Sequence, residues 1–167
     1  MNSTTEAATL YPVPNLLELM NTPDAIRSRR QWVVWKLKRR KEGWDKQPFM
    51  PSGKPASHSD LMTWSSFEEA TEALHAEGSG FRGVGFVFSS GDPFVGLDFD
   101  HCRDPGSGEL DERAARIIHK LGGYSEVSPS GHGVHVFVKA EIPRPVKKDW
   151  IEIYSERRFF TVTGRAL

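Results

Sequence analysis

The chain has a single cysteine, no long apolar run and no net charge. Cys102 cannot form an internal disulfide, which suits a reducing compartment such as the cytoplasm. It follows His101, but no Cys-x-x-Cys pair accompanies it, so a zinc site is not indicated. The apolar runs are too short to span a bilayer, and residues 1–7 lack the basic and apolar stretches of a secretory signal. The sequence therefore predicts a cytoplasmic protein without a membrane segment.

The zero net charge hides two basic flanks. Residues 27–54 contain ten Lys and Arg side chains against two acids, and residues 139–167 contain seven against four. Residues 60–126, between the flanks, are acidic. This distribution suits a protein that grips phosphate groups while central carboxylates hold a metal. A solvated basic surface would explain any one of these residues equally well.

The length of 167 residues, with 38% hydrophobic side chains, fits one domain with its own core. Residues 1–12 are polar and are predicted to be disordered, so the domain is expected to comprise residues 13–167. Helices are predicted from about Pro23, from Ser65 to about Ala76, and over residues 110–121. Strands are predicted over residues 32–37, 84–89, 94–100, 124–128, 134–139, 150–155 and 159–163.

Local sequence signals indicate where some of these elements begin and which strands pair. Ser65 and Glu68 have the spacing of a capping box at the start of the second helix. Residues 39–60 read as a loop because they are rich in glycine and proline. The strands on either side of Gly91-Asp-Pro are predicted to pair as a β-hairpin. Together the elements predict an α+β domain, with a mainly antiparallel sheet and helices packed on one face.

The most informative stretch runs from Phe94 to Asp100. Apolar residues alternate there with Gly96, Asp98 and Asp100, so a strand presents both carboxylates on one face. Two ionised carboxylates side by side repel each other, whereas Mg²⁺ and Mn²⁺ prefer such oxygen ligands. Gly96 leaves the same face bare, where a ligand could approach the backbone. On these residues alone, a solvent-facing strand explains the pair equally well.

Two later strands carry reactive side chains opposite an apolar set. His135 follows a turn of small residues and faces away from three valines of its strand. Glu152 faces away from the isoleucines on either side of it. A sheet that buries one face and exposes the other would bring His135 and Glu152 beside Asp98 and Asp100.

The order of these motifs resembles a known family. Asp-x-Asp at 98–100, Ser-Gly-x-Gly-x-His at 130–135 and a hydrophobic residue before Glu152 are similar to the three motifs of the archaeo-eukaryotic primase superfamily. The nearest likeness is to primase-polymerases encoded by phages, plasmids and integrated elements. Flanking segments share the likeness, which spans roughly residues 30–165: 31–36, 44–48, 56–57, 63–70 and 158–164.

The resemblance implies an RRM-like catalytic sheet preceded by a smaller N-terminal α/β unit. It implies a nucleotidyltransferase, a DNA primase or DNA-directed DNA polymerase, in which Asp98, Asp100 and Glu152 hold two Mg²⁺ or Mn²⁺ ions. His135 would contact the triphosphate of the incoming ribo- or deoxynucleotide. The implied partners are a single-stranded DNA template and a helicase domain or protein, in the cytoplasm of a bacterial host of the mobile element. Larger relatives usually continue beyond this point, so we expect either an excised catalytic core or a small standalone protein.

Further residues are candidates for nucleotide binding. Arg158 is predicted to reach phosphate, and Lys46 to reach nucleotide or template. The turn residues predicted to bring backbone N–H groups to phosphate oxygens are Ser130, Gly131 and Gly133. A tight hairpin turn alone would also explain the two glycines. For Glu152, the simple alternative is a surface ion pair with Lys147 or Arg157.

Two other functions remain open. A non-catalytic module would use the same residues to bind single-stranded nucleic acid or a nucleotide. Rolling-circle replication initiators also use an RRM-like sheet, with two metal-binding histidines and a nucleophilic tyrosine. Here His132 and His135 are three residues apart and face opposite ways in a strand, and Tyr154 lies in a strand. The sequence therefore favours the primase-polymerase over the initiator.

Overall fold

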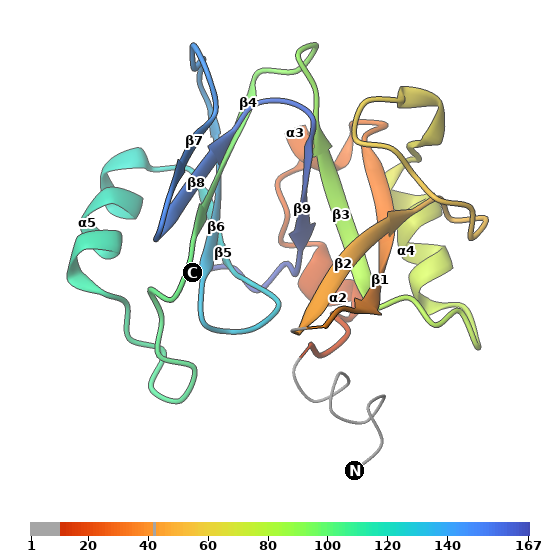
Figure 1. Cartoon of the computed structure of the whole chain (residues 1–167), viewed down its shortest axis with the longest axis horizontal. Helices are drawn as coiled ribbons and strands as arrows, with labels where there is room; N and C mark the ends of the chain where they lie inside the picture. Colours follow the sequence, from red (N-terminus) through yellow and green to blue (C-terminus); the bar gives the residue numbers. More distant parts are fainter. Residues whose placement is uncertain (1–10, 42) are drawn as a thin grey trace.

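The computed structural model describes residues 11–41 and 43–167, whose strands form two antiparallel sheets (Figure 1). The first sheet has the order β2-β1-β3-β9, with β1 (Trp32–Arg39), β2 (Trp44–Phe49), β3 (Gly83–Phe88) and β9 (Arg158–Val162). The second has the order β5-β6-β4-β8-β7, with β4 (Phe94–Phe99), β5 (Tyr124–Val127), β6 (Val134–Lys139), β7 (Val146–Lys148) and β8 (Ile151–Tyr154). The predicted disorder of residues 1–12 falls almost wholly outside the described residues.

Short helices accompany the sheets, in agreement with the predicted α+β class. They are α2 (Leu16–Leu19), α3 (Asp24–Arg27), η1 (Leu61–Thr63), α4 (Phe67–His75) and α5 (Glu112–Leu121). Figure 1 shows α5 on the outer side of the second sheet, and α4 lies against β1 and β3. Within the described residues, no helix is long and apolar enough to cross a membrane.

Two apolar cores hold the sheets in place. The outer face of the second sheet packs on α5, where Val134 and Val136 of β6 lie with Ala114. The other core lies between the sheets and is rich in phenylalanine. Its central rings have centroids 5.0 to 6.3 Å apart and come from Phe86, Phe88, Phe137 and Phe160. Aromatic pairs at these separations contribute beyond the area that they bury.

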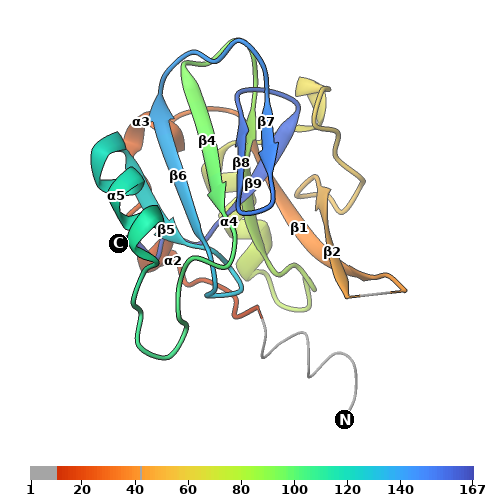
Figure 2. The same ribbon diagram turned by 60° about the vertical axis from the view of Figure 1, so that its left-hand side comes forward.

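Strand β9 belongs to the first sheet but lies across the inner face of the second. It pairs with β3, and Figure 2 shows it running obliquely to β4 and β6. Past β9 the chain reaches the edge of β5. There the N–H of Val127 donates to the carbonyl of Arg165 at 2.8 Å, and the N–H of Leu167 to the carbonyl of Ser125 at 3.0 Å. The last strand therefore fastens one sheet to the other.

The segment 39–60 is not the continuous loop that its composition predicts. Residues Trp44–Phe49 form β2, which pairs with β1 from Arg39↔Trp44 to Val34↔Phe49. Pro48 is tolerated because β2 is an edge strand, where a missing N–H removes no bond inside the sheet. The loop prediction was wrong because the proline content argues against a central strand but not against an edge strand.

The predicted hairpin between residues 84–89 and 94–100 is also wrong. These residues form β3 and β4, as expected, but the two strands lie in different sheets. The carboxylate of Asp92 shapes the connection, because it accepts hydrogen bonds from the N–H groups of Ser89 at 3.0 Å and Phe94 at 2.7 Å. Strand alternation looks the same in a hairpin and in a crossover between sheets, so it could not separate the two.

The capping box of α4 lies one residue later than predicted. The Ser66 hydroxyl accepts from the N–H of Glu69 at 3.1 Å, and the Glu69 carboxylate accepts from the N–H of Ser66 at 2.8 Å. Ser65 is buried instead, and its hydroxyl donates to the carbonyl of Trp32 at 2.9 Å. The helix predicted over residues 110–121 is α5, which begins at Glu112 and ends at Leu121, and its C-cap Gly122 adopts a left-handed conformation.

Gly96 makes the contact between the sheets possible. A Cβ atom there would lie 2.4 Å from Cζ of Phe88 and 2.7 Å from Cε2 of Phe160. The bare position predicted for an approaching ligand is therefore filled by two aromatic rings of the first sheet. Only glycine allows β3 and β9 to pack this closely on β4.

Replacing Gly96 with alanine should destabilise the fold. We expect a loss of about 1–3 kcal/mol in the free energy of unfolding, because an overpacked core must shift backbone and rings. Urea unfolding followed by circular dichroism measures this loss. The matched control is Gly91→Ala on the exposed connection, where the nearest atom to the new Cβ would be 3.8 Å away. Equal unfolding midpoints for G96A and G91A would show that the close packing at Gly96 is not needed.

Candidate active site

Five side chains form one row across the second sheet, one from each strand. The register pairs Glu126 with His135, His135 with Asp98, Asp98 with Glu152, and Glu152 with Lys147. Directly opposed residues of antiparallel strands project from the same face. We call these five the inner row. It brings together Asp98, His135 and Glu152, as the alternation in their strands predicts.

Strand β9 and the residues after it follow the inner row from one end to the other. In order, the contacts join Arg158 Nη2 to Glu152 Oε2 at 3.3 Å, His135 Nδ1 to the carbonyl of Thr161 at 2.9 Å, and the N–H of Thr163 to Glu126 Oε1 at 2.9 Å. The crossing strand thus supplies one partner to each of three strands beneath it. The inner row is held by the first sheet as well as by its own.

His135 is buried between two carboxylates. Its Nε2 lies 3.5 Å from Asp98 Oδ1, and its Nδ1 lies 3.8 Å from Glu126 Oε1. Burial opposes a charge on the ring, but the negative charges of Asp98 and Glu126 outweigh it and raise the pKa of His135. Nδ1–H donates to the carbonyl of Thr161, and the second ring nitrogen, Nε2, is directed at Asp98. A protonated ring can therefore donate from Nε2 toward Asp98 or toward an anion bound beside it.

Asp100 lies just past the end of β4 and is exposed. Its backbone N–H donates to the carbonyl of Trp150 at 3.1 Å, which ties it to the start of β8. Desolvation of its carboxylate, together with the negative charges of Asp98 and Glu152, raises the pKa of Asp100. The carboxylates of Asp98, Asp100 and Glu152 therefore lie at this end of the sheet. The repulsion between them disfavours the charged form of Asp100.

Glu152 has cationic partners already. Lys147 Nζ lies 2.6 Å from Oε1, and Oε2 receives the Tyr154 hydroxyl at 3.0 Å beside the Arg158 guanidinium. Burial opposes the charge, but these partners outweigh it and lower the pKa of Glu152. The ion pair with Lys147, which the sequence offers as the simple alternative, is therefore present. The second cation is Arg158, not Arg157.

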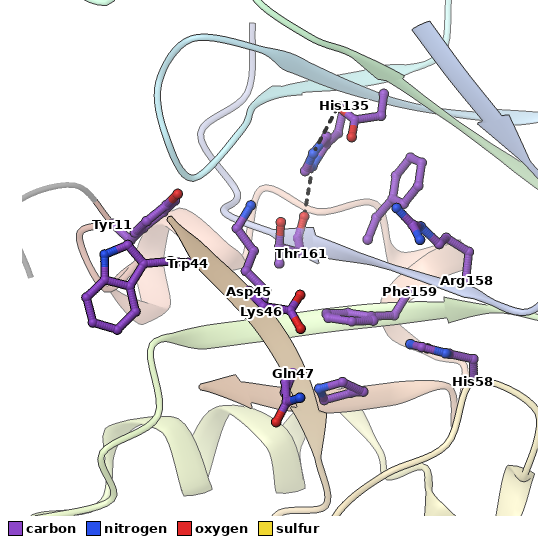
Figure 3. A pocket seen from close by; sticks show the side chains of 13 residues that line it. Tyr11, Trp44, Asp45, Lys46, Gln47, His58, His135, Arg158, Phe159 and Thr161 are labelled. Atoms are coloured by element: carbon purple, nitrogen blue, oxygen red, sulfur yellow. Dashed lines mark hydrogen bonds and ion pairs between the residues drawn. The ribbon is translucent and has the colours of Figure 1, made fainter. Parts of the chain in front are cut away.

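A cavity of about 420 Å³ opens between β2, β9 and the inner row. Asp98 and His135 line its wall on the second sheet. The remaining lining residues come from β2, from β9 and from two loop positions: Trp44–Pro48, Arg158–Thr161, Tyr11 and His58. Figure 3 shows His58 beside Phe159, with stacked rings whose centroids are 5.6 Å apart. The cavity thus has a polar wall and an aromatic wall, and its volume suits a small-molecule ligand.

Lys46 enters this cavity from β2. In Figure 3 its side chain extends from the strand toward Thr161 and His135. Burial lowers the pKa of Lys46, while the negative charges of Asp98 and Asp100 act against that lowering. A half-buried ammonium opposite these carboxylates is placed to bind an anion held between them. Lys46 and Arg158, both predicted from sequence, therefore lie at the same cavity as His135.

The three small residues of the turn before β6 do not line this cavity. Ser130 and Gly131 line a second hollow, and a Cβ on Gly133 would lie 2.6 Å from the carbonyl oxygen of Phe99. Gly133 is thus explained by its close packing against β4. Gly131 needs its positive φ of 81° for the turn. The turn-forming alternative accounts for both glycines in this structure.

Glu126 is a residue that the sequence analysis missed. It is fully buried, and its carboxylate accepts hydrogen bonds from the N–H groups of Thr163 and Gly164 and from the Tyr124 hydroxyl, each at 2.9 Å. Buried charges are rare unless they are satisfied in this way. The available signal was an acid at the inward position of a strand that leads into His135. Its two backbone partners lie 37 and 38 residues away in sequence, so no local pattern could reveal them.

The carboxylates differ in how well they would fit a divalent metal. Among residues 11–41 and 43–167, no group of three or more His, Cys, Asp or Glu side chains is placed to hold a metal ion. Asp98 and Asp100 nevertheless offer oxygen ligands, and a cation would relieve the repulsion that raises the pKa of Asp100. Glu152 would first have to exchange Lys147 for the metal. The two aspartates therefore have the right ligand chemistry, whereas Glu152 could join them only after its ion pair with Lys147 is broken.

Comparison with known proteins gives a clear likeness to a phage DNA primase-polymerase. No family model matches the chain. The chain is similar to a DNA primase-polymerase of Nitratiruptor phage NrS-1, with 36% identity over 148 residues and 84% of this chain covered. It spans 20% of the length of the phage protein, so the likeness is to one part of a longer chain.

Replacing Glu126 with glutamine should weaken the fold. The amide places an NH₂ group against one of the backbone N–H donors, so we expect a loss of about 1–3 kcal/mol in the free energy of unfolding. Thermal and urea unfolding of the purified variant measure the loss. Glu156→Gln, in the exposed turn before β9, is the matched control and should change stability by less than about 0.5 kcal/mol. If E126Q were as stable as E156Q, the carboxylate would not be the fastening point described here.

Proposed function

We propose that this chain catalyses template-directed nucleotidyl transfer, as a DNA primase, a DNA polymerase or both. The observation that carries the proposal is the inner row, in which Asp98 lies directly between His135 and Glu152. Of these three residues, Asp98 and His135 line the cavity of about 420 Å³. The similarity to a phage DNA primase-polymerase supports the same reaction class. We also propose that the chain has an RRM-like fold and belongs to the archaeo-eukaryotic primase superfamily.

In the proposed mechanism, Asp98 and Asp100 would hold Mg²⁺ or Mn²⁺, and Glu152 would be a third ligand if it gave up its ion pair with Lys147. Two such ions would lower the pKa of the attacking 3′-hydroxyl and stabilise the leaving pyrophosphate. The protein's own contribution is positioning. His135 donates from Nε2 to the triphosphate, while its Nδ1–H is held by Thr161. Lys46 and Arg158 supply two further positive charges around the same cavity.

The aromatic wall suits the base of the nucleotide. Phe159 and His58 stack with an interplanar angle of 13°, and both line the cavity. Flat, largely apolar rings accept any base by stacking, without reading its edge. This arrangement favours a template-directed enzyme, in which pairing with the template selects the base.

A non-catalytic nucleotide- or nucleic-acid-binding module is the second candidate. The cation partners of Glu152 favour it, because a carboxylate that is already neutralised needs no metal. The proposed setting of the catalytic function is replication of a phage, plasmid or integrated element in a bacterial cytoplasm. A helicase would there supply the single-stranded template, and both primed extension and unprimed synthesis are expected.

Loss of the aspartate oxygens should abolish incorporation. We expect Asp98→Asn and Asp100→Asn each to lower the rate by about 100-fold or more, which corresponds to roughly 3 kcal/mol of lost transition-state stabilisation. The measurement is nucleotide incorporation on primed and unprimed single-stranded templates with Mg²⁺ or Mn²⁺. Asp149→Asn, an exposed acid before β8, is the control. Normal rates in both variants would contradict the metal assignment, whereas a folded wild-type chain without product would favour the binding module.

Lys46 should act on the nucleotide rather than on the template. A charge-assisted hydrogen bond contributes about 1.5–3 kcal/mol, so Lys46→Met should raise the KM for the nucleoside triphosphate by roughly 10- to 100-fold. The template Kd, measured by fluorescence anisotropy, should stay unchanged. Lys54→Met, in the exposed turn after β2, tests for nonspecific effects of removing a positive charge. A changed template Kd with an unchanged nucleotide KM would overturn the role of Lys46.

A further inference from the structure

A second hollow lies beside the turn that leads into β6. Its volume is about 470 Å³, and three stretches of chain enclose it together with Pro12: residues 103–105, 127–131 and 165–166. In Figures 1 and 2 the β4–α5 connection, the β5–β6 turn and the C-terminal end of the chain come together at the lower end of the second sheet. The proposed mechanism leaves this hollow without a role.

Among the described residues that line the hollow there are two arginines, Arg103 and Arg165, and no carboxylate. Arg103 Nη1 donates to the carbonyl of Gly131 at 3.0 Å, and Arg165 Nη2 donates to the carbonyl of Pro129 at 3.5 Å. The Arg103 Nε is buried and has no hydrogen-bond partner within the described residues. Since a guanidinium has five N–H donors, each arginine keeps donors for a ligand after bracing the turn.

Neither guanidinium is neutralised by a salt bridge within the described part of the chain. The nearest acid in sequence is Asp104. Its Oδ1 accepts from the N–H groups of Gly106 at 2.9 Å and Ser107 at 2.6 Å, and these bonds lower the pKa of Asp104 more than Arg103 does. Two uncompensated guanidiniums around one concave site suit a phosphate group, which arginine binds through parallel N–H bonds.

The hollow lies next to the candidate active site. Consecutive residues line the two spaces, because Tyr11 contributes to the cavity of His135 and Pro12 to the hollow of the two arginines. Pro129 and Gly131 also belong to the turn that leads into His135. A strand of nucleic acid that ends in the first space can therefore place a phosphate in the second.

We propose that Arg103 and Arg165 bind a backbone phosphate of the nucleic-acid strand on which the enzyme acts. This inference rests on the proposed function, because it takes the neighbouring cavity as the site of nucleotide addition. A phosphate could come from a strand or from a free nucleoside triphosphate. Proximity to the active site and continuity along the chain favour the strand.

The test is oligonucleotide binding by the full chain, measured as fluorescence anisotropy of a labelled oligothymidylate at several salt concentrations. The Arg103→Gln/Arg165→Gln double variant should bind more weakly at low salt. Its plot of log K against log salt should be shallower by about 0.7 for each phosphate of the single strand that the variant no longer neutralises. Arg116→Gln, on the exposed side of α5, should keep the wild-type slope. An unchanged slope in the double variant would overturn the proposal.

Two further measurements separate the loss of phosphate binding from unfolding and identify the source of the phosphate. Arg165→Gln alone removes only a 3.5 Å hydrogen bond to the turn, so it tests the site even if the double variant unfolds. Titration with ATP distinguishes the two phosphate sources, and weaker ATP binding with unchanged oligonucleotide binding would contradict the strand assignment. If wild-type chain incorporates nucleotides but these variants bind oligothymidylate normally, this inference fails and the proposed function stands. If wild-type chain neither binds nor extends a strand, both fail.

Discussion

The crossing of β9 over the second sheet is the constraint on which the site depends. The strand hydrogen-bonds to β3 in one sheet and contacts β8 and β6 of the other through Arg158 and Thr161. The residues that follow it hydrogen-bond to β5. A shift of β9 by one residue would turn its side chains over and would remove the Thr161 carbonyl from His135. Gly96 permits this crossing, and Glu126 fastens its far end.

The inner row meets two opposing requirements, because charged carboxylates side by side weaken a sheet but are the proposed ligands of a metal ion. Asp98 and Glu152 face each other directly across β4 and β8, an arrangement that destabilises a sheet when both are charged. Lys147 and Arg158 beside Glu152 offset the repulsion, and His135 beside Asp98 does so when its ring is protonated. Within the described residues, Asp100, beyond the strand end, forms no such salt bridge, and its pKa rises. The row is therefore stable enough to fold, yet it leaves an excess of negative charge where a divalent ion is proposed.

The sequence predicted those features that depend on the period of a strand or helix. Alternation placed Asp98, His135 and Glu152 on one face, and apolar spacing located α5. The prediction failed for features that depend on which distant segments of the chain pair with each other. The partition of strands into two sheets was missed, because Phe86 and Phe88 alternate in the same way whichever strand lies opposite. Glu126 was missed for the same reason, since its partners come from the end of the chain.

Manganese binding tests the central claim most directly. Electron paramagnetic resonance of Mn²⁺ counts free ions, so a titration of the wild-type chain with a nucleoside triphosphate present reports the bound ions without any need for turnover. We expect the wild-type chain to remove Mn²⁺ signal beyond what the nucleotide alone removes, and the folded Asp98→Asn/Asp100→Asn variant not to do so. Equal Mn²⁺ binding by the two proteins would contradict the assignment of the aspartates as metal ligands.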